Sequence, residues 1–205
     1  MKKIISIVLL AALCLCLAAC GKTQAAKDWE TSVAAIGEDV NYDSAPAIAQ
    51  ARREYEALTD EEKKSVDLEK FETIEKTFFE LPASPLKSAE YLKSKMKDPT
   101  SFRLYGDIFF AEFDNDEGEL IGYVAQIGCA AKNGYGAYSG EEMYDVIALA
   151  DGSVTIVSDD DSTYLDFTGF VPQGEISVAS EEHGMKITVF DGKHIADLMG
   201  CEYFD

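Results

Sequence analysis

The spacing of the apolar residues changes once along the chain, and this change constrains the fold more than any other sequence feature. Between residues 28 and 81 apolar residues recur every three or four positions, which is the period of helices that bury one face. From Phe102 onward the period is two, which is typical of half-buried strands. Two prolines at 82–85 separate these regions. We therefore expect an α+β chain, with a small helical bundle at 28–81, a linker at 82–85 and an α+β domain at 86–205.

Three helices are predicted in the first region. The first ends at Gly37, and the second begins at Ser44. The third begins at a capping box formed by Thr59 and Glu62 and continues to Leu81. Each has an apolar side that it cannot bury alone, so we expect the three to pack together as a bundle.

The second region is expected to place one helix on a mainly antiparallel sheet. Ser84 is the predicted cap of that helix, and Asp98-Pro99 ends it. The strand candidates follow between residues 102 and 190, and Asp151-Gly152 is the strongest hairpin signal among them. A short helix at 194–199 is expected to close the chain.

The N-terminal residues have the layout of a secretory signal. Lys2 and Lys3 precede an uncharged apolar run at 4–17, which is shorter than the roughly 20 residues of a membrane-spanning helix. The motif Leu17-Ala18-Ala19-Cys20 follows and resembles the lipobox of bacterial prolipoproteins. That resemblance implies that residues 1–19 are a signal peptide and that Cys20 becomes the lipid-modified N-terminus.

The alternative is ordinary signal cleavage after Ala19, which would put the bulky Leu17 where a small residue is preferred. With the lipobox, we expect attachment to the cell membrane through the lipid on Cys20, with the protein facing outward. A short tether at 20–27 would then join the lipid to the folded part.

Acidic residues dominate the chain and narrow its partners. There are 38 Asp and Glu against 18 Lys and Arg, and without Lys2 and Lys3 the 16 remaining basic residues leave a net charge of −22. Nucleic acid is a poor partner for such a chain, because that binding draws on cationic side chains. Anionic lipid headgroups should also repel the body, so we expect the lipid alone to hold it at the membrane.

Two further resemblances concern known families. Segments at 33–37, 42–44, 51–59 and 63–66 are similar to a helical module of surface proteins from Gram-positive anaerobes, over about residues 28–80, although Asp67-Leu68 replaces its usual Asn-Tyr pair. This resemblance implies a spacer or interaction module. Segments at 97–102 and 130–136 resemble an α+β domain of uncharacterised exported lipoproteins, over about 86–157, which implies fold and location only.

Residues for catalysis are few. The histidines are His183, in a turn-like stretch, and His194, which with Asp197 supplies only two metal ligands. A cysteine nucleophile paired with His194 would lack any family signature. We therefore expect no enzyme activity and no cofactor; the alternative is a small exported hydrolase that acts on cell-wall or peptide substrates through carboxylates such as Asp145 and Asp166.

The remaining candidates are a loop, an acidic cluster and a cysteine pair. Asn133, Tyr135 and Tyr138 lie in a glycine-rich loop suited to recognising a protein or a glycan, unless the tyrosines fold back on the sheet. The weak calcium candidates are Asp159, Asp160 and Asp161, whose charges are otherwise a solvated run. Cys129 and Cys201 are a candidate disulfide pair.

Together these features predict a membrane-anchored extracytoplasmic lipoprotein that acts as a binding or interaction module. A further alternative is an accessory subunit of another envelope protein.

Overall fold

The computed structural model describes residues 22–114, 120–149, 152–158, 178–179 and 186–204. Its helices are α2 (Gln24–Ile36), α3 (Ala45–Ala57), α4 (Asp60–Lys63), α5 (Leu68–Phe79), α6 (Pro85–Lys95) and α7 (Gly192–Met199). The 3₁₀ turns are η1 (Tyr42–Ser44) and η2 (Pro99–Ser101). Its strands are β1 (Arg103–Asp114), β2 (Leu120–Ala130), β3 (Glu142–Leu149), β4 (Val154–Ser158), β5 (Val178–Ala179), β6 (Lys186–Phe190) and β7 (Glu202–Phe204). The predicted α+β class is confirmed.

Within the described residues the strands form one seven-stranded sheet. Six strands follow the order β4-β3-β2-β1-β6-β5, and the seventh, β7, pairs with β1 outside this order. The long strand β1 has two neighbours on its outer side, because residues 108–112 pair with β6 and residues 103–105 pair with β7. The β1–β7 pairing is parallel, and the other pairings are antiparallel. The short strand β7 was not predicted from the sequence.

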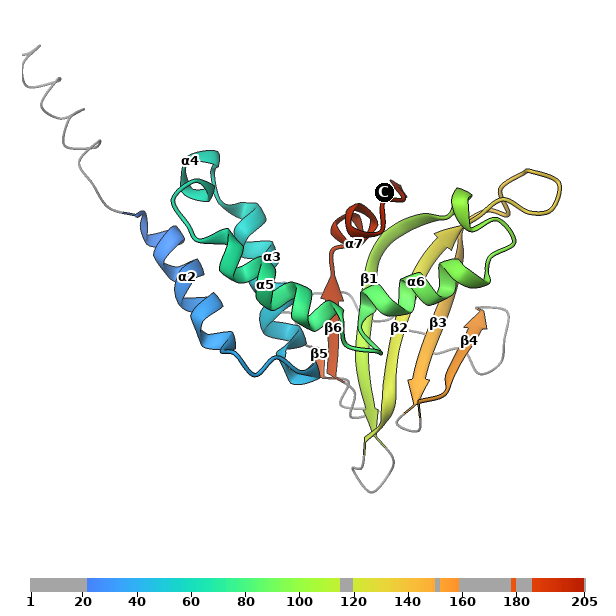
Figure 1. Cartoon of the computed structure of the whole chain (residues 1–205), viewed down its shortest axis with the longest axis horizontal. Helices are drawn as coiled ribbons and strands as arrows, with labels where there is room; N and C mark the ends of the chain where they lie inside the picture. The colour runs from blue at the N-terminus through green and yellow to red at the C-terminus, as the bar shows by residue number, and fades with distance from the viewer. Residues whose placement is uncertain (1–21, 115–119, 150–151, 159–177, 180–185, 205) are drawn as a thin grey trace, which may run out of the picture.

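The helices lie on one face of this sheet and beside its β1–β6 side (Figure 1). Helix α6 crosses β2 and β3, α7 packs on β1, and α3 contacts β6. The N-terminal helices meet around Trp29, whose indole Nε1 donates to the carbonyl of Ala51 at 2.8 Å and whose ring lies 5.7 Å from that of Phe71. Trp29 of α2 thus contacts both α3 and α5.

Side-chain caps explain where several helices begin. The hydroxyl of Thr59 accepts from the backbone of Glu62, and the carboxylate of Glu62 accepts from the backbone of Thr59, which is the capping box predicted from the sequence. The hydroxyl of Ser84 caps α6, with Pro85 at its first position, also as predicted.

Two local predictions are wrong. The helix expected from Thr59 to Leu81 is interrupted at residues 64–67, because the carboxylate of Asp67 accepts from the backbone of Lys70 and starts α5 anew. Residues 24–27, which were expected to belong to a tether, lie instead in α2, because that helix begins at Gln24 with Thr23 as its cap.

The main buried core runs across the predicted linker. It extends from Trp29 in α2 to Ile195 in α7 and includes Phe110 and Val146 from the inner face of the sheet. The ring of Phe78 in α5 stacks on that of Phe190 in β6 at 5.5 Å. The helices and the sheet therefore bury their apolar faces against each other.

The contact between α7 and β1 depends on two glycines. A Cβ added to Gly192 would lie 1.9 Å from the carbonyl oxygen of Gly106, which itself has a φ of +59° at an irregularity of β1. Residues with a side chain rarely adopt that backbone conformation, and no side chain fits between the backbones of Gly106 and Gly192.

Replacing Gly192 by Ala should therefore lower the free energy of unfolding by about 2 kcal/mol or more, because the helix must move off the strand. Gly134→Ala is the matched control, since its added Cβ would meet nothing within 4 Å. Chemical denaturation measures both variants, and equal stability would contradict this account of the α7–β1 contact.

Candidate functional site

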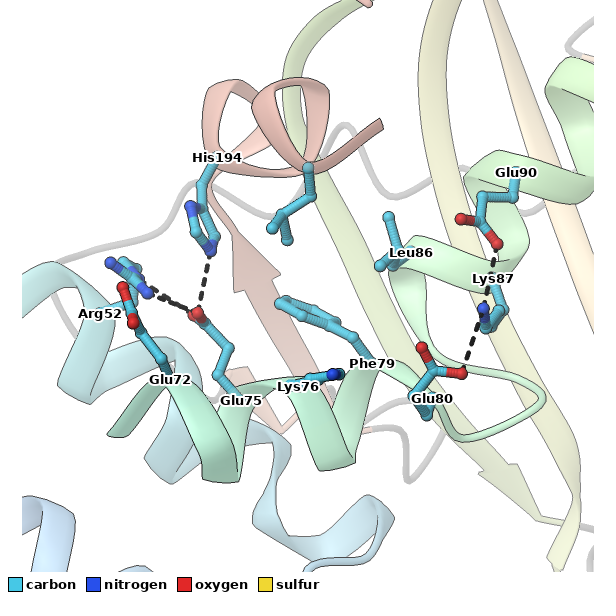
Figure 2. Close-up of a pocket in the computed structure, with 11 residues that line it drawn as sticks. Arg52, Glu72, Glu75, Lys76, Phe79, Glu80, Leu86, Lys87, Glu90 and His194 are labelled. Atoms are coloured by element: carbon cyan, nitrogen blue, oxygen red, sulfur yellow. Dashed lines mark hydrogen bonds and ion pairs between the residues drawn. The ribbon is translucent and has the colours of Figure 1, made fainter. Parts of the chain in front are cut away.

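A pocket of about 460 Å³ lies between α5, α6 and α7, with Arg52 of α3 at one end (Figure 2). Its apolar side chains are Phe79, Leu86 and Leu198, one from each of the three helices. The charged and polar side chains of its lining are Arg52, Glu72, Glu75, Lys76, Glu80, Lys87, Glu90 and His194. The volume lies in the range of pockets that take small molecules.

The carboxylate of Glu75 is the polar centre of this pocket. Nε of Arg52 donates to its Oε1 at 3.0 Å, and a second guanidinium nitrogen donates to its Oε2. Nε2 of His194 lies 3.0 Å from the same Oε2, which is an ion-pair distance without an aligned hydrogen bond. One carboxylate thus joins α3, α5 and α7.

Helical periodicity brings these side chains to the interior. Glu75 follows the buried Phe71 by one helical turn, and Arg52 follows the buried Ile48 by one turn. Glu75 is only 4% exposed, and the Arg52 guanidinium lies 5.1 Å from the centre of the Phe71 ring. Both charges are therefore on the apolar faces of their helices, where each needs a partner.

The ionisation of this cluster follows from its contacts. Burial would raise the pKa of Glu75, but contact with His194 and Arg52 outweighs burial, so the pKa lies below its ordinary value. Burial would likewise lower the pKa of Arg52, but pairing with Glu75 outweighs it and raises that pKa. Arg52 and Glu75 are therefore both charged at neutral pH.

Lys87 occupies the opposite end of the pocket. Its ammonium lies 3.2 Å from a carboxylate oxygen of Glu90 and 3.4 Å from one of Glu80. Figure 2 marks both contacts with dashed lines. The hydrogen bond to Glu90 raises the pKa of Lys87. The ammonium of Lys87 is thus shared by two carboxylates at this end.

The two cysteines considered above as possible nucleophiles are not placed for catalysis. Cys129 is buried, and this burial raises the pKa of its thiol to about 12, so the thiolate is scarce at neutral pH. Burial also raises the pKa of Cys201. Both cysteines are free thiols, so the candidate disulfide is not formed in this structure.

The carboxylate and the histidine of the hydrolase alternative do not meet. Asp145 is fully buried, and its Oδ1 accepts from Nε2 of Gln126 at 3.0 Å. Gln126 pairs with Asp145 on one side and with Phe109 on the other, so all three side chains lie on the same face of the sheet. Phe109 packs on the face opposite the main core. His194 lies on the helix-covered face beside Phe79. Asp166 and His183 lie outside the described residues.

The glycine-rich loop is held by its own side chains. Oδ1 of Asn133 accepts from the backbone of Tyr135 at 2.9 Å, and the backbone of Asn133 donates to Ala137 at 2.7 Å. Tyr138 folds back, with the Arg103 guanidinium 3.7 Å from its ring centre. Tyr135 projects from the loop and is 98% exposed. Of the three predicted loop residues, Tyr135 is fully exposed, and Asn133 and Tyr138 are half-buried.

Neither a metal-binding cluster nor a membrane-spanning helix is found among the described residues. Within these ranges no group of three or more His, Cys, Asp or Glu side chains could hold a metal ion. The calcium candidates Asp159, Asp160 and Asp161 lie outside the described residues. Among the described helices, none is both long and apolar enough to cross a membrane.

Comparisons of the chain with protein-family models, with curated proteins and with solved structures find no match. The family resemblances of the sequence therefore stay predictions.

Sequence reasoning missed Arg52 and Glu75 as site residues. The signal was present, since each is a charged residue in a position that the apolar periodicity assigns to the buried face. What the period does not give is the partner, because Arg52 and Glu75 lie on different helices and His194 comes from the far end of the chain.

Glu75→Gln should lower the free energy of unfolding by about 3 kcal/mol at pH 7, because it leaves the buried Arg52 charge without its partner. Since folding lowers the pKa of Glu75, its stabilising effect is present above the ordinary carboxyl pKa and is lost as the pH falls through the lowered value. The difference from the wild type should therefore shrink below about pH 4.5.

Urea unfolding at several pH values measures this difference. Glu61→Gln is the control, because Glu61 pairs with Lys64 on the exposed surface and should matter little. A Glu75→Gln effect no larger than that of Glu61→Gln, or one that grows in acid, would contradict the assignment.

Proposed function

We propose that this chain is a lipid-anchored binding protein at the outer face of the cell membrane, and that the pocket between α5, α6 and α7 takes its ligand. The composition of the pocket carries this proposal. Its apolar side chains come from three helices, while Arg52, Glu75 and Lys87 already have partners within the protein. Such a lining can hold a ligand, because the apolar side chains contact an apolar part of it and the charged side chains orient it.

The pocket lining favours binding over catalysis. It contains no serine, threonine or cysteine, and its histidine is engaged with Glu75. A hydrolase would need a nucleophile or an activated water close to a base. Most of the carboxylates in the lining that could act in this way are paired, Glu75 with Arg52 and both Glu80 and Glu90 with Lys87. The partner is therefore a ligand, a protein or a glycan at the cell surface, and nucleic acid is disfavoured by the negative charge.

The start of α2 supports the anchored arrangement. Lys22 forms an ion pair with Glu30, and the hydroxyl of Thr23 donates to Glu62 at 2.6 Å. The chain is thus tied into the fold two residues after Cys20. With the lipid on Cys20, so short a connection keeps the pocket near the membrane surface.

Cys20→Ser tests the anchor. Without the thiol that receives the lipid, most of the protein should leave the membrane fraction or stay unprocessed, because the lipid is the proposed anchor of the processed protein. Fractionation and mass spectrometry of the N-terminus provide the measurement. Cys16→Ser, within the predicted signal peptide, should change nothing. Unchanged attachment of a Cys20→Ser protein that is still cleaved before residue 20 would refute the lipid anchor.

A photo-crosslinking residue at Leu198 tests the binding site. Leu198 lines the pocket and is 49% exposed, while Leu120 on β2 is 44% exposed and lies outside the pocket lining. In intact cells a defined adduct should form from position 198 and not from position 120. No adduct at 198, or the same adducts from both positions, would count against the pocket as the binding site.

A further inference from the structure

We infer that the pocket between α5, α6 and α7 selects a small organic ammonium ion, in which an amine is joined to an apolar body. This inference rests on the binding function proposed above and names the chemistry of its ligand. It follows from three observations: the balance of charge in the lining, the position of the apolar side chains and the charge of the whole chain.

The lining has an excess of carboxylates. Four glutamates line the pocket against the three fixed cations of Arg52, Lys76 and Lys87. At one end Glu75 is matched by the bidentate contact with Arg52. The excess therefore lies elsewhere in the lining, where it would favour a positive ligand.

The positive charge of the ligand would lie at the end of the pocket formed by α5 and α6. Glu80 and Glu90 share the single ammonium of Lys87, at 3.4 Å and 3.2 Å, and both carboxylates are more exposed than the lysine. Each carboxylate has lone pairs to spare for a second ammonium. A ligand amine beside Lys87 would meet two acceptors, the carboxylates of Glu80 and Glu90. Their contacts with Lys87 already hold these carboxylates in position.

The apolar side chains define the rest of the ligand. Phe79 is buried at the base, Leu86 is half-buried, and Leu198 is 49% exposed at the pocket. An exposed leucine beside a buried phenylalanine gains from being covered, since burial of apolar surface is favourable. An apolar body of the ligand would cover Leu198 while its amine reaches Glu80 and Glu90.

The net negative charge of the whole chain also favours a positively charged ligand. The net charge of −20 over the full sequence attracts cations and repels anions before contact. A carboxylate ligand would meet both this field and the excess glutamates of the lining. A neutral ligand would use only the apolar side chains.

Three probes of similar shape separate these cases. The lipid-anchored protein in zwitterionic nanodiscs is titrated with 2-phenylethylammonium, with 2-phenylethanol and with 3-phenylpropanoate, and nanodiscs without protein correct for partitioning. The ammonium should bind at least about tenfold more tightly than the alcohol, which is typical of hydrogen bonds to charged groups, and the carboxylate most weakly.

Matched variants locate the selectivity. Glu80→Gln combined with Glu90→Gln should reduce the preference for the ammonium to about twofold or less. Glu61→Gln combined with Glu69→Gln removes the same charge from exposed positions outside the pocket lining and should leave the preference in place. Leu198→Ala should weaken binding of the ammonium and the alcohol alike.

The outcomes distinguish the inference from the proposed function. Leu198-dependent binding of the alcohol or the carboxylate as tight as that of the ammonium overturns the inference and leaves the binding pocket intact. Equal loss of selectivity in both double variants also overturns it, because the field of the chain would then be responsible. If no probe binds, the inference fails, and crosslinking at Leu198 judges the binding function separately.

Discussion

The carboxylate of Glu75 is buried where α3, α5 and α7 meet, and the surrounding structure is arranged to match its charge. Arg52 reaches it from α3 with two nitrogens, and His194 reaches it from α7 at 3.0 Å. A buried ion pair adds little net stability, because desolvation offsets the attraction. We therefore expect it to act on specificity, because any packing that separates these side chains leaves a buried charge unmatched. The contact therefore fixes the last helix against helices that precede the sheet in the chain, and the pocket lies beside it.

Local sequence signals predicted much of this fold. The capping box at Thr59 and the cap at Ser84 depend on residues within one helical turn, and the structure contains both. The interruption at residues 64–67 was missed, because the apolar positions continue through it while Asp67 starts a new helix. The strand β7 was missed because its three residues are held by a partner about a hundred positions earlier in the chain.

The site was less predictable than the fold, for a physical reason. The positions of Arg52 and Glu75 on apolar faces show that each needs a partner, but periodicity says nothing of which segments meet in space. The loop illustrates the opposite case. Its tyrosines are equivalent in the sequence, yet Tyr138 is covered by Arg103 and Tyr135 is exposed. In the proposed arrangement, the lipid on Cys20 supplies the location, and the pocket supplies the contact with a ligand.

The coupling of α7 to the N-terminal helices through Glu75 is the central claim, and hydrogen exchange of the backbone amides of α7 tests it most directly. Arg52→Met keeps an unbranched apolar side chain on α3 and removes the guanidinium charge. Because Glu75 would then lose its main partner, exchange of the α7 amides around Ile195 should become much faster, although the substitution lies in another helix. If the faster exchange is confined to α3 and α7 keeps its protection, the buried charge cluster does not hold these elements together.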